Sequence, residues 1–307
     1  MSLRLYTHPD CFGHDPGNDH PESPARLHAV LQALDDPPFA AIERVEAPRA
    51  TREQLERVHA SEYVDYIFAS APRHGTARLD PDTLMSPGSL EAALRATGAA
   101  CAATDALLAR EIRRAFCAVR PPGHHATRDE AMGFCLFNSI AAAAAHALGA
   151  HLLDRVAIVD FDVHHGNGTQ AIFRHDPRVL YASSHQMPLY PGTGAADEHG
   201  AGNIFNAPLP PGAGSAEFRT AWEEKLLPEL DLFRPKLLLI SAGFDAHARD
   251  PLAQLRLETE DYTWITQRLA ELADRHADGR IVSALEGGYD LEALRECTAA
   301  HVTALMA

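Results

Sequence analysis

The chain has 307 residues, 46% of them apolar and 22% charged, so it can bury a large hydrophobic core. Its 27 Lys and Arg stand against 42 Asp and Glu, which gives a formal net charge of −15 at pH 7, and the basic residues form no run. This composition excludes a disordered, collagenous or coiled-coil chain. The charge disfavours a nucleic-acid partner, because such binding depends on neutralising phosphates.

The five cysteines are scattered and include no C-x-x-C pair: Cys11, Cys101, Cys117, Cys135 and Cys297. They indicate free thiols in a reducing compartment. The amino-terminal MSLRLYTHPD lacks the apolar stretch of a secretory signal, so we expect a cytoplasmic protein. The uncharged segment 131–153 has the length of a membrane span, but alanine fills its middle. We interpret it as a buried helix and expect no membrane partner.

Local signals place the elements in chain order. Ser23 and Pro24 provide a cap and a first-turn proline for a helix over ARLHAVLQAL, and Thr51 with Gln54 resembles a capping box. Beyond them the patterns predict a helix at 89–110, a strand at 115–119, a helix at 138–150, strands at 156–163 and 179–183, a helix at 215–232, a strand at 237–241, a helix at 259–276, a strand at 281–285 and a helix at 290–306. This alternation indicates a parallel sheet with helices on both faces. Since no linker or repeat divides the chain, we expect a single domain over residues 1–307.

Each predicted strand is followed by a loop rich in glycine or reactive side chains. In chain order these loops contain RPPGHH, HHGNG, SSHQMPLYPGTG, AGFDAH and EGGYD. In open α/β sheets ligands bind outside the carboxyl ends of the strands. The sequence therefore predicts one functional site at that edge.

A metal site is predicted at the end of the second of these strands. Asp160, Asp162 and His164 alternate there, and in an extended strand they would point to the same side. Burying two carboxylates and an imidazole together needs a compensating cation. With Asp245 from GFDAH, Asp162 and His164 would form a three-ligand centre with an open position, typical of catalytic Zn²⁺. Oxygen-rich ligation also admits Fe²⁺, Mn²⁺ or Co²⁺.

Other side chains near the predicted site have two interpretations. His124 and His125 could exchange protons with a hydrolytic water, or could simply stabilise their loop. Tyr289 could donate to an oxyanion or close the core. Phe134 and Tyr190, in glycine-flanked loops, could line a slot for an alkyl chain or serve packing alone. For His165 and His247 we favour a structural role, either capping a helix or contacting the residues that ligate the metal.

The motifs RPPGHH, GFCLFN, DFDVHHGNGTQ, YPGTG, NAPLPPG, SAGFDAH and EGGY, in this order, resemble the histone deacetylase superfamily, which includes acetylpolyamine amidohydrolases. The resemblance runs from HPESPARL near residue 20 to the final predicted helix. It implies a three-layer α/β/α, arginase-like fold with a central, mostly parallel sheet of about eight strands. It also implies zinc-dependent removal of acetyl or other short acyl groups from amines.

The resemblance also implies roles for individual residues. The zinc ligands fall on Asp162, His164 and Asp245, and the paired histidines fall on His124 and His125, with the second as general base and acid. The remaining assignments are Asp160 as partner of the first histidine, Tyr289 as the carbonyl-polarising tyrosine, and Gly133, Phe134, Tyr190 and Leu252 beside the substrate. Arg26 resembles an arginine near the base of the pocket.

Monovalent-cation sites and one departure follow from the same resemblance. A structural K⁺ site is expected at Asp160, Asp162, His164, Ser183 and Ser184, and a second near Phe173, Asp176, Val179 and Asn203. Where the best-known nuclear members carry an aspartate beside the second histidine, this chain has Asn167, as class II relatives do. An amide cannot stabilise an imidazolium by charge, so the proton affinity of His125 should be lower than with an aspartate partner.

The substrate is less well defined by the sequence. Polyamine-selective relatives place a carboxylate where this chain has Leu252, which favours acylated lysine in proteins or peptides, while Asp250 keeps an acetylated small amine as the alternative. An arginase-like dinuclear hydrolase would need a carboxylate where His247 stands. A metal-free binding module would have lost a metal ligand, the general base or the tyrosine, and this chain keeps all of them. A homo-oligomer is left open.

Overall fold

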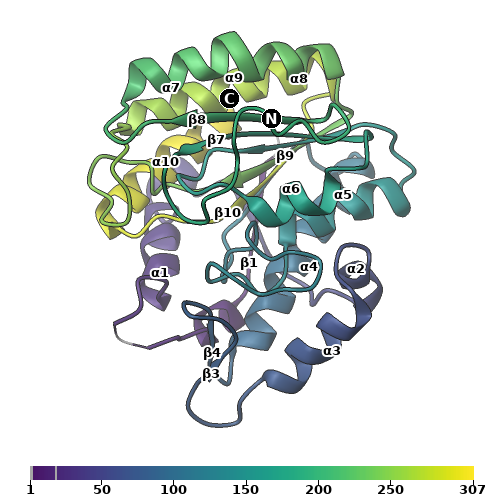
Figure 1. Cartoon of the computed structure of the whole chain (residues 1–307), viewed down its shortest axis with the longest axis vertical. Helices are drawn as coiled ribbons and strands as arrows, with labels where there is room; N and C mark the ends of the chain where they lie inside the picture. The colour runs from purple at the N-terminus through teal and green to yellow at the C-terminus, as the bar shows by residue number, and fades with distance from the viewer. Residues whose placement is uncertain (1–2, 18) are drawn as a thin grey trace.

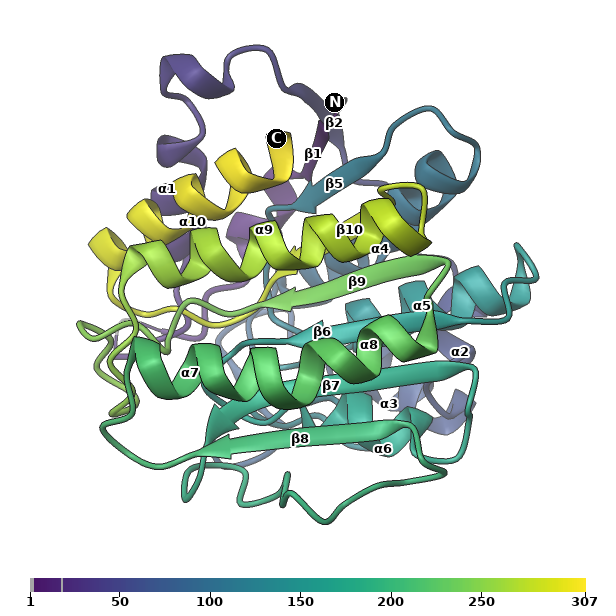
Figure 2. The same ribbon diagram turned by 90° about the horizontal axis from the view of Figure 1, so that it is seen from above.

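The computed structural model describes residues 3–17 and 19–307. An eight-stranded sheet runs through the centre in the order β2-β1-β5-β10-β9-β6-β7-β8, and every neighbouring pair is parallel (Figures 1 and 2). Its strands are β1 Leu3–Thr7, β2 Glu43–Glu46, β5 Arg114–Cys117, β6 Val156–Asp160, β7 Val179–Gln186, β8 Ile204–Leu209, β9 Leu237–Ala242 and β10 Ile281–Leu285. A separate antiparallel pair joins β3 Ala77–Arg78 and β4 Leu84–Met85.

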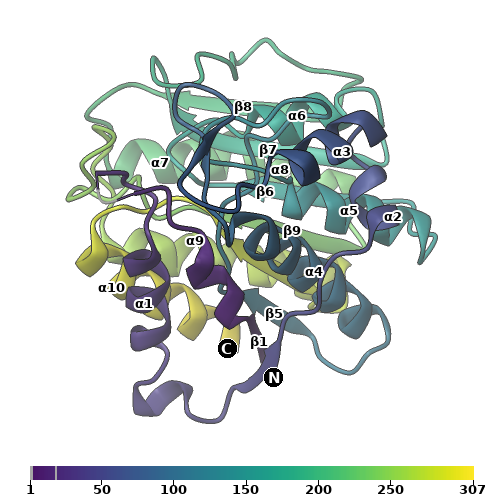
Figure 3. The same ribbon diagram turned by 90° about the horizontal axis from the view of Figure 1, so that it is seen from below.

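Helices cover both faces of the large sheet, as the alternating pattern predicted. One layer contains α7 Ser215–Ala221, α8 Leu227–Phe233, α9 Thr259–His276 and α10 Leu291–Met306 (Figure 2). The opposite layer contains α4 Ser89–Leu108, α5 Ser139–Gly149 and α6 Asn167–Phe173, and it is seen from its own side in Figure 3. The remaining helices are α1 Pro24–Ala33, α2 Arg52–Glu56 and α3 Ser61–Ser70, and single turns lie at Pro9–Gly13 and Pro37–Phe39. The predicted three-layer α/β/α fold is confirmed.

The core lies between the layers. Every residue of β6 and β9 is buried, as expected for central parallel strands that are covered on both faces. The uncharged segment forms α5, whose first turn is capped by the Asn138 side chain accepting from the Ala141 N–H at 3.0 Å. In the described residues no helix is long and apolar enough to cross a membrane.

Some predicted boundaries are wrong for identifiable reasons. The strand predicted at 156–163 ends at Asp160, and the helix predicted at 215–232 is interrupted by a π-helical turn at Trp222–Leu226. Three strands of the large sheet, and the short pair β3 and β4, carried no clear signal. Of these, β2 is a largely exposed edge strand and β8 an edge strand that tolerates Pro208, while β1 is only five residues long.

Candidate active site

The predicted site residues lie at the carboxyl ends of neighbouring strands. In the sheet, β5, β10, β9 and β6 are consecutive, so the loops that follow them meet at one edge. His124 and His125 follow β5, Asp162 and His164 follow β6, Asp245 follows β9 and Tyr289 follows β10. This arrangement agrees with the general location of ligand sites in open α/β sheets.

The three predicted metal ligands are brought together. Asp162, His164 and Asp245 each offer one ligand atom, and these atoms all lie within 4.8 Å of one another. Nδ1 of His164 lies 3.1 Å from Oδ1 of Asp162 and 3.2 Å from Oδ2 of Asp245. The expectation that Asp162 and His164 continue the extended strand of Asp160 is wrong, because β6 ends at Asp160. The loop after the strand orients these two side chains.

The charge and the packing of this cluster fit a divalent cation. Asp162 and Asp245 are 1% and 0% exposed, and burial together with the charge of Asp162 raises the pKa of Asp245 to about 7. Two adjacent buried carboxylates are costly unless positive charge compensates them. Two glycines leave space for the carboxylates, because any larger residue would clash with them. A Cβ at Gly243 would lie 2.0 Å from Oδ2 of Asp162, and one at Gly287 would lie 2.0 Å from Oδ2 of Asp245.

The two tandem histidines have different surroundings. Nδ1 of His124 lies 2.9 Å from Oδ2 of Asp160, which also accepts from the Tyr181 hydroxyl at 3.0 Å. Burial alone would lower the pKa of His124, but Asp160 and the neighbouring carboxylates hold it well above its usual value. Burial, and then the charges of the neighbouring histidines, hold the pKa of His125 well below its usual value. The two adjacent rings therefore have pKa values shifted in opposite directions.

Sequence reasoning missed the residue that joins these loops, Glu286. Its Oε2 accepts the backbone N–H groups of Gly123 and His124 at 2.6 and 3.2 Å, and its Oε1 accepts from the Ser241 hydroxyl at 3.0 Å. Burial raises its pKa to about 7. Its position before the two glycines of EGGYD could have marked it as a site residue. The neighbouring sequence did not indicate its hydrogen-bond partners.

Arg26 supports the loop of Tyr289 from below. Its Nε donates to the Gly288 carbonyl at 2.6 Å and one Nη donates to the Glu286 carbonyl at 2.5 Å. Its guanidinium carbon lies 4.8 Å from the centre of the Tyr289 ring. Arg26 thus contacts both the loop and the ring of Tyr289. It is not among the residues that line the described pocket, so its place near the pocket base stays a prediction.

A cavity of about 220 Å³ opens onto the cluster. Gly133 permits a close approach here, since a Cβ on it would lie 2.4 Å from the His125 ring. The Phe134 ring meets Tyr289 edge-on at 6.0 Å, and the Tyr190 ring meets His125 at 5.3 Å. The lining consists of Asp82, Pro122, His124, His125, Gly133, Phe134, His164, Leu189, Tyr190, Leu252, Gly287 and Tyr289. All four residues predicted beside the substrate are among them, whereas Asp82 and Leu189 were not predicted.

Three residues near the site are engaged elsewhere. Asp250 accepts the N–H groups of Tyr289 and Leu252 at 2.7 and 3.0 Å. His247 Nδ1 accepts the Arg249 N–H at 3.2 Å, and His165 Nδ1 lies 2.7 Å from the Thr193 hydroxyl. The contacts of His247 and His165 support a structural role for both histidines. Asp250 holds the loop of Tyr289 next to its own loop.

The residues predicted for monovalent cations are also close together. Asp160 of β6 pairs in register with Ser183 of β7, and the Ser184 hydroxyl accepts from the Trp222 indole at 3.0 Å. At the second predicted site, Nδ2 of Asn203 donates to three carbonyls at 2.7 to 3.1 Å, those of Phe173, Asp176 and Val179. Occupancy by K⁺ stays a prediction.

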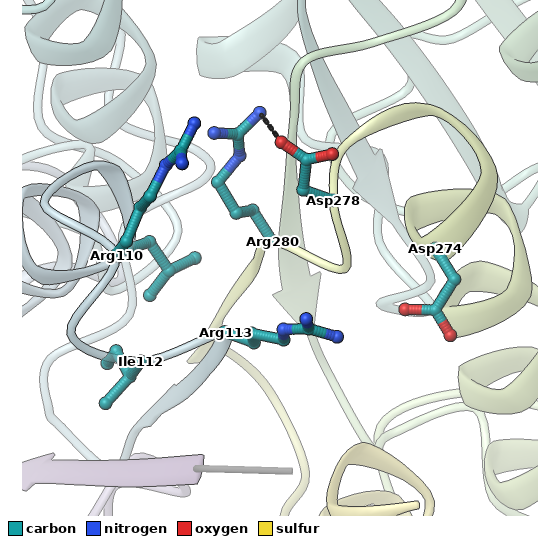
Figure 4. A pocket seen from close by; sticks show the side chains of 7 residues that line it. Arg110, Ile112, Arg113, Asp274, Asp278 and Arg280 are labelled. Carbon is teal, nitrogen blue, oxygen red and sulfur yellow. Dashed lines mark ion pairs between the residues drawn. The ribbon is translucent and has the colours of Figure 1, made fainter.

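A larger cavity, of about 590 Å³, lies at the other end of the sheet (Figure 4). It adjoins the amino ends of β5 and β10 and contains an ion pair of Arg280 with Asp278 at 3.4 Å. Its lining is Leu107, Arg110, Ile112, Arg113, Asp274, Asp278 and Arg280. None of the predicted site residues is among them, so cavity size alone would have indicated the wrong place.

Comparison with known proteins agrees with the geometry. The model of the histone deacetylase domain matches residues 20–305. A histone deacetylase-like amidohydrolase of Pseudomonas aeruginosa is 42% identical over 88% of this chain and 72% of its own length. A probable deacetylase of Archaeoglobus fulgidus is 38% identical over 100% of this chain and 87% of its own.

The fold also matches that of a solved structure. The crystal structure of the HDA15 HD domain superposes with a TM-score of 0.94 at 35% identity, covering 100% of this chain and 88% of that one. The sequence motifs, the site and the fold all agree. The chain therefore belongs to the histone deacetylase family, as the order of its motifs predicted.

Proposed function

We propose that this deacetylase-family hydrolase is zinc-dependent and removes acetyl or another short acyl group from an amine, principally from acylated lysine in peptides or proteins. The observation that carries the proposal is the three-ligand cluster, whose member His164 lines the same pocket as His125 and Tyr289. A metal, a proton acceptor and an oxyanion donor are the groups that metal-assisted amide hydrolysis uses.

Asp162, His164 and Asp245 would hold the ion. Two carboxylates and one imidazole suit Zn²⁺, and Fe²⁺, Mn²⁺ and Co²⁺ share these donors. A divalent ion bound there supplies Lewis-acid activation of water and of the acyl carbonyl.

His125 would move the proton. Its Nδ1 lies 2.8 Å from Oδ1 of Asn167, so Nδ1 carries the hydrogen of the neutral ring and Nε2 is left as the base. Nε2 accepts a proton from the attacking water and returns it to the leaving amine. The charged ring of His124, held by Asp160, stabilises the negative charge that develops between these steps.

Tyr289 would donate a hydrogen bond to the oxygen of the tetrahedral oxyanion. Burial raises the pKa of its phenol well above the usual value, which keeps the donor proton in place at neutral pH. The contact with Arg26 fixes the ring in the pocket wall. The donor is thus oriented before the substrate arrives.

The pocket favours acylated lysine over an acetylated polyamine. Phe134, Leu189, Tyr190 and Leu252 give it an aromatic and aliphatic lining that suits a methylene chain, which both substrate classes present, so the preference rests on the distal ammonium of a polyamine. The Asp250 carboxylate is occupied by backbone N–H groups and is not offered to a distal ammonium. Asp82, whose carboxylate lines the pocket and accepts the Gly133 N–H at 3.2 Å, is the observation that keeps the polyamine alternative.

The test compares turnover of an acetyl-lysine peptide with that of an acetylated diamine by zinc-loaded enzyme. We expect the peptide to be preferred, and His125→Ala and Tyr289→Phe to lose activity while zinc content is unchanged. Preference for the diamine, abolished by Asp82→Asn, would replace acyl-lysine with polyamine. If the folded, zinc-loaded chain turns over neither substrate, the deacetylase proposal is rejected.

A further inference from the structure

A second cluster of metal-binding side chains lies outside the pocket. Asp105 belongs to α4, His146 to the last turn of α5, and His151 to the loop that follows. Oδ1 of Asp105 lies 2.7 Å from Nε2 of His146 and 2.6 Å from Nε2 of His151. The ligand atoms of the three residues all lie within 4.8 Å of one another, as do those of the Asp162 cluster.

No other side chain competes for these three groups in the described part of the chain. Among the described residues, the only side-chain hydrogen bond of each ring is to Asp105. His146 is only 8% exposed, and its Nδ1 is buried without a hydrogen-bond partner. Burial works against the charge of Asp105, but the two histidines lower the pKa of its carboxyl. The cluster therefore offers one carboxylate and two imidazole nitrogens that can exchange hydrogen bonds for metal bonds.

The surroundings admit a cation. The Asp105 side chain is 50% exposed and that of His151 is 30% exposed, so an ion can enter from solvent. Arg57 packs against Gly149 nearby, but its guanidinium donates to Glu53 at 2.6 Å. By contrast, Asp231 is bonded to Arg275 as well as to His276, and the permanent charge of the arginine would repel a metal there. The carboxyl end of α5 adds a favourable helix dipole for a cation.

We propose that Asp105, His146 and His151 form a second metal site for a divalent transition ion such as Zn²⁺, Co²⁺ or Ni²⁺, with water completing its coordination. Two imidazoles and one carboxylate are the donors these ions prefer, and they do not suit Mg²⁺ or Ca²⁺. The ion links α4, the end of α5 and the following loop.

This second site is structural or regulatory, and it is not catalytic. Its loop residue His151 precedes β6 in the chain, whereas Asp162 and His164 follow β6, and the two clusters share no residue. A metal bound here stabilises the folded chain by cross-linking helices that are distant in sequence. The proposal is independent of the reaction catalysed at the pocket.

The test counts metal. The metal-free chain is titrated with Zn²⁺ by calorimetry, and with Co²⁺ by visible absorption. We expect two equivalents for the wild type, one for His151→Ala and for Asp105→Asn, and one for Asp245→Asn, which removes an active-site ligand instead. His175→Ala, an exposed histidine outside both clusters, serves as the matched control and should bind two.

Thermal unfolding supplies a readout that does not depend on activity. Zn²⁺ added beyond the first equivalent should raise the Tm of the wild type and of His175→Ala but not that of His151→Ala. The His151→Ala enzyme loaded with one equivalent should keep wild-type turnover. One equivalent in the wild type, or two in both His151→Ala and Asp105→Asn, would overturn the proposal.

Discussion

The side-chain oxygen of Asn167 lies 2.8 Å from Nδ1 of His125. The tandem ring of His124 instead faces the carboxylate of Asp160 at 2.9 Å. Two adjacent histidines thus receive different partners, an amide and a carboxylate, and the proposed mechanism assigns them different roles. This difference leads to the first prediction.

Asn167→Ala should lower kcat with little change in KM. Without the amide the His125 ring loses the contact that fixes its tautomer, so part of the roughly 10²–10⁴-fold contribution of general acid–base catalysis is lost. Steady-state kinetics together with metal content measures this. An unchanged kcat in the metal-loaded variant would show that the contact is only structural.

Tyr289→Phe should reduce kcat by roughly 10²–10³-fold, the usual loss when one oxyanion donor is removed. The ring and its contact with Arg26 stay in place, so stability and zinc content should not change. Tyr66→Phe, at an exposed tyrosine outside the pocket, is the control. Equal activity of the two variants would refute the role of the phenol.

Glu22→Gln should strongly destabilise the fold. Glu22 is fully buried and accepts from Arg120 Nε at 2.6 Å and Arg26 at 3.0 Å, so its neutralisation leaves two buried guanidiniums without compensation. The expected loss of unfolding free energy is on the order of 3–5 kcal/mol. Chemical denaturation measures it, with Glu56→Gln, at a partly exposed residue that pairs with Arg52, as a control expected to change stability by less than about 1 kcal/mol.

The same network has a pH signature. Burial alone would raise the pKa of Glu22, but Arg120, His14 and Arg26 hold it well below its usual value. The stabilisation is therefore complete above the ordinary carboxyl pKa and is lost as pH falls below it. The wild type and Glu22→Gln should converge in stability in strong acid.

His59 should make the fold lose stability below neutral pH. Its Nδ1 lies 2.8 Å from the Thr127 carbonyl and its Nε2 accepts the Asn138 N–H at 3.0 Å, an arrangement that needs the neutral ring. Burial lowers its pKa from 6.5 to about 4. Between these values only the unfolded chain gains the proton, which costs on the order of 3 kcal/mol by pH 4.

Unfolding curves at pH 7 and pH 4.5 test this expectation. The wild type should lose more stability over that interval than His59→Gln, which is less stable at pH 7 but cannot titrate. Parallel losses in the two proteins would assign the acid sensitivity to other groups.

Tyr262→Phe should stabilise the chain. Tyr262 is 0% exposed, and its hydroxyl has no hydrogen-bond partner among the described residues. Removing an unsatisfied buried hydroxyl should raise the free energy of unfolding by about 1 kcal/mol. A measured decrease would mean that the hydroxyl has a partner, for example a bound water.

The sequence by itself determined the fold class and the candidate metal ligands. Runs such as VAIV before Asp160 and LLLI before Ser241 predicted buried parallel strands, because burial on both faces leaves continuous apolar residues. The carboxyl ends of such strands must meet at one edge, which placed Asp162, His164 and Asp245 in one site before any distance was known. The edge strands β2 and β8 were not predicted from the sequence, since β2 is largely exposed and β8 contains Pro208.

Only the tertiary structure decided the contacts between distant segments. Glu22 with Arg120, Glu286 with Gly123, and Asp105 with His146 and His151 are separated by 41 to 163 residues and leave no local periodic trace. The loop after β6, which turns Asp162 and His164 toward Asp245, is likewise set by packing against neighbouring loops. Local patterns report burial and propensity, whereas these partners depend on how the helices and loops close around the sheet.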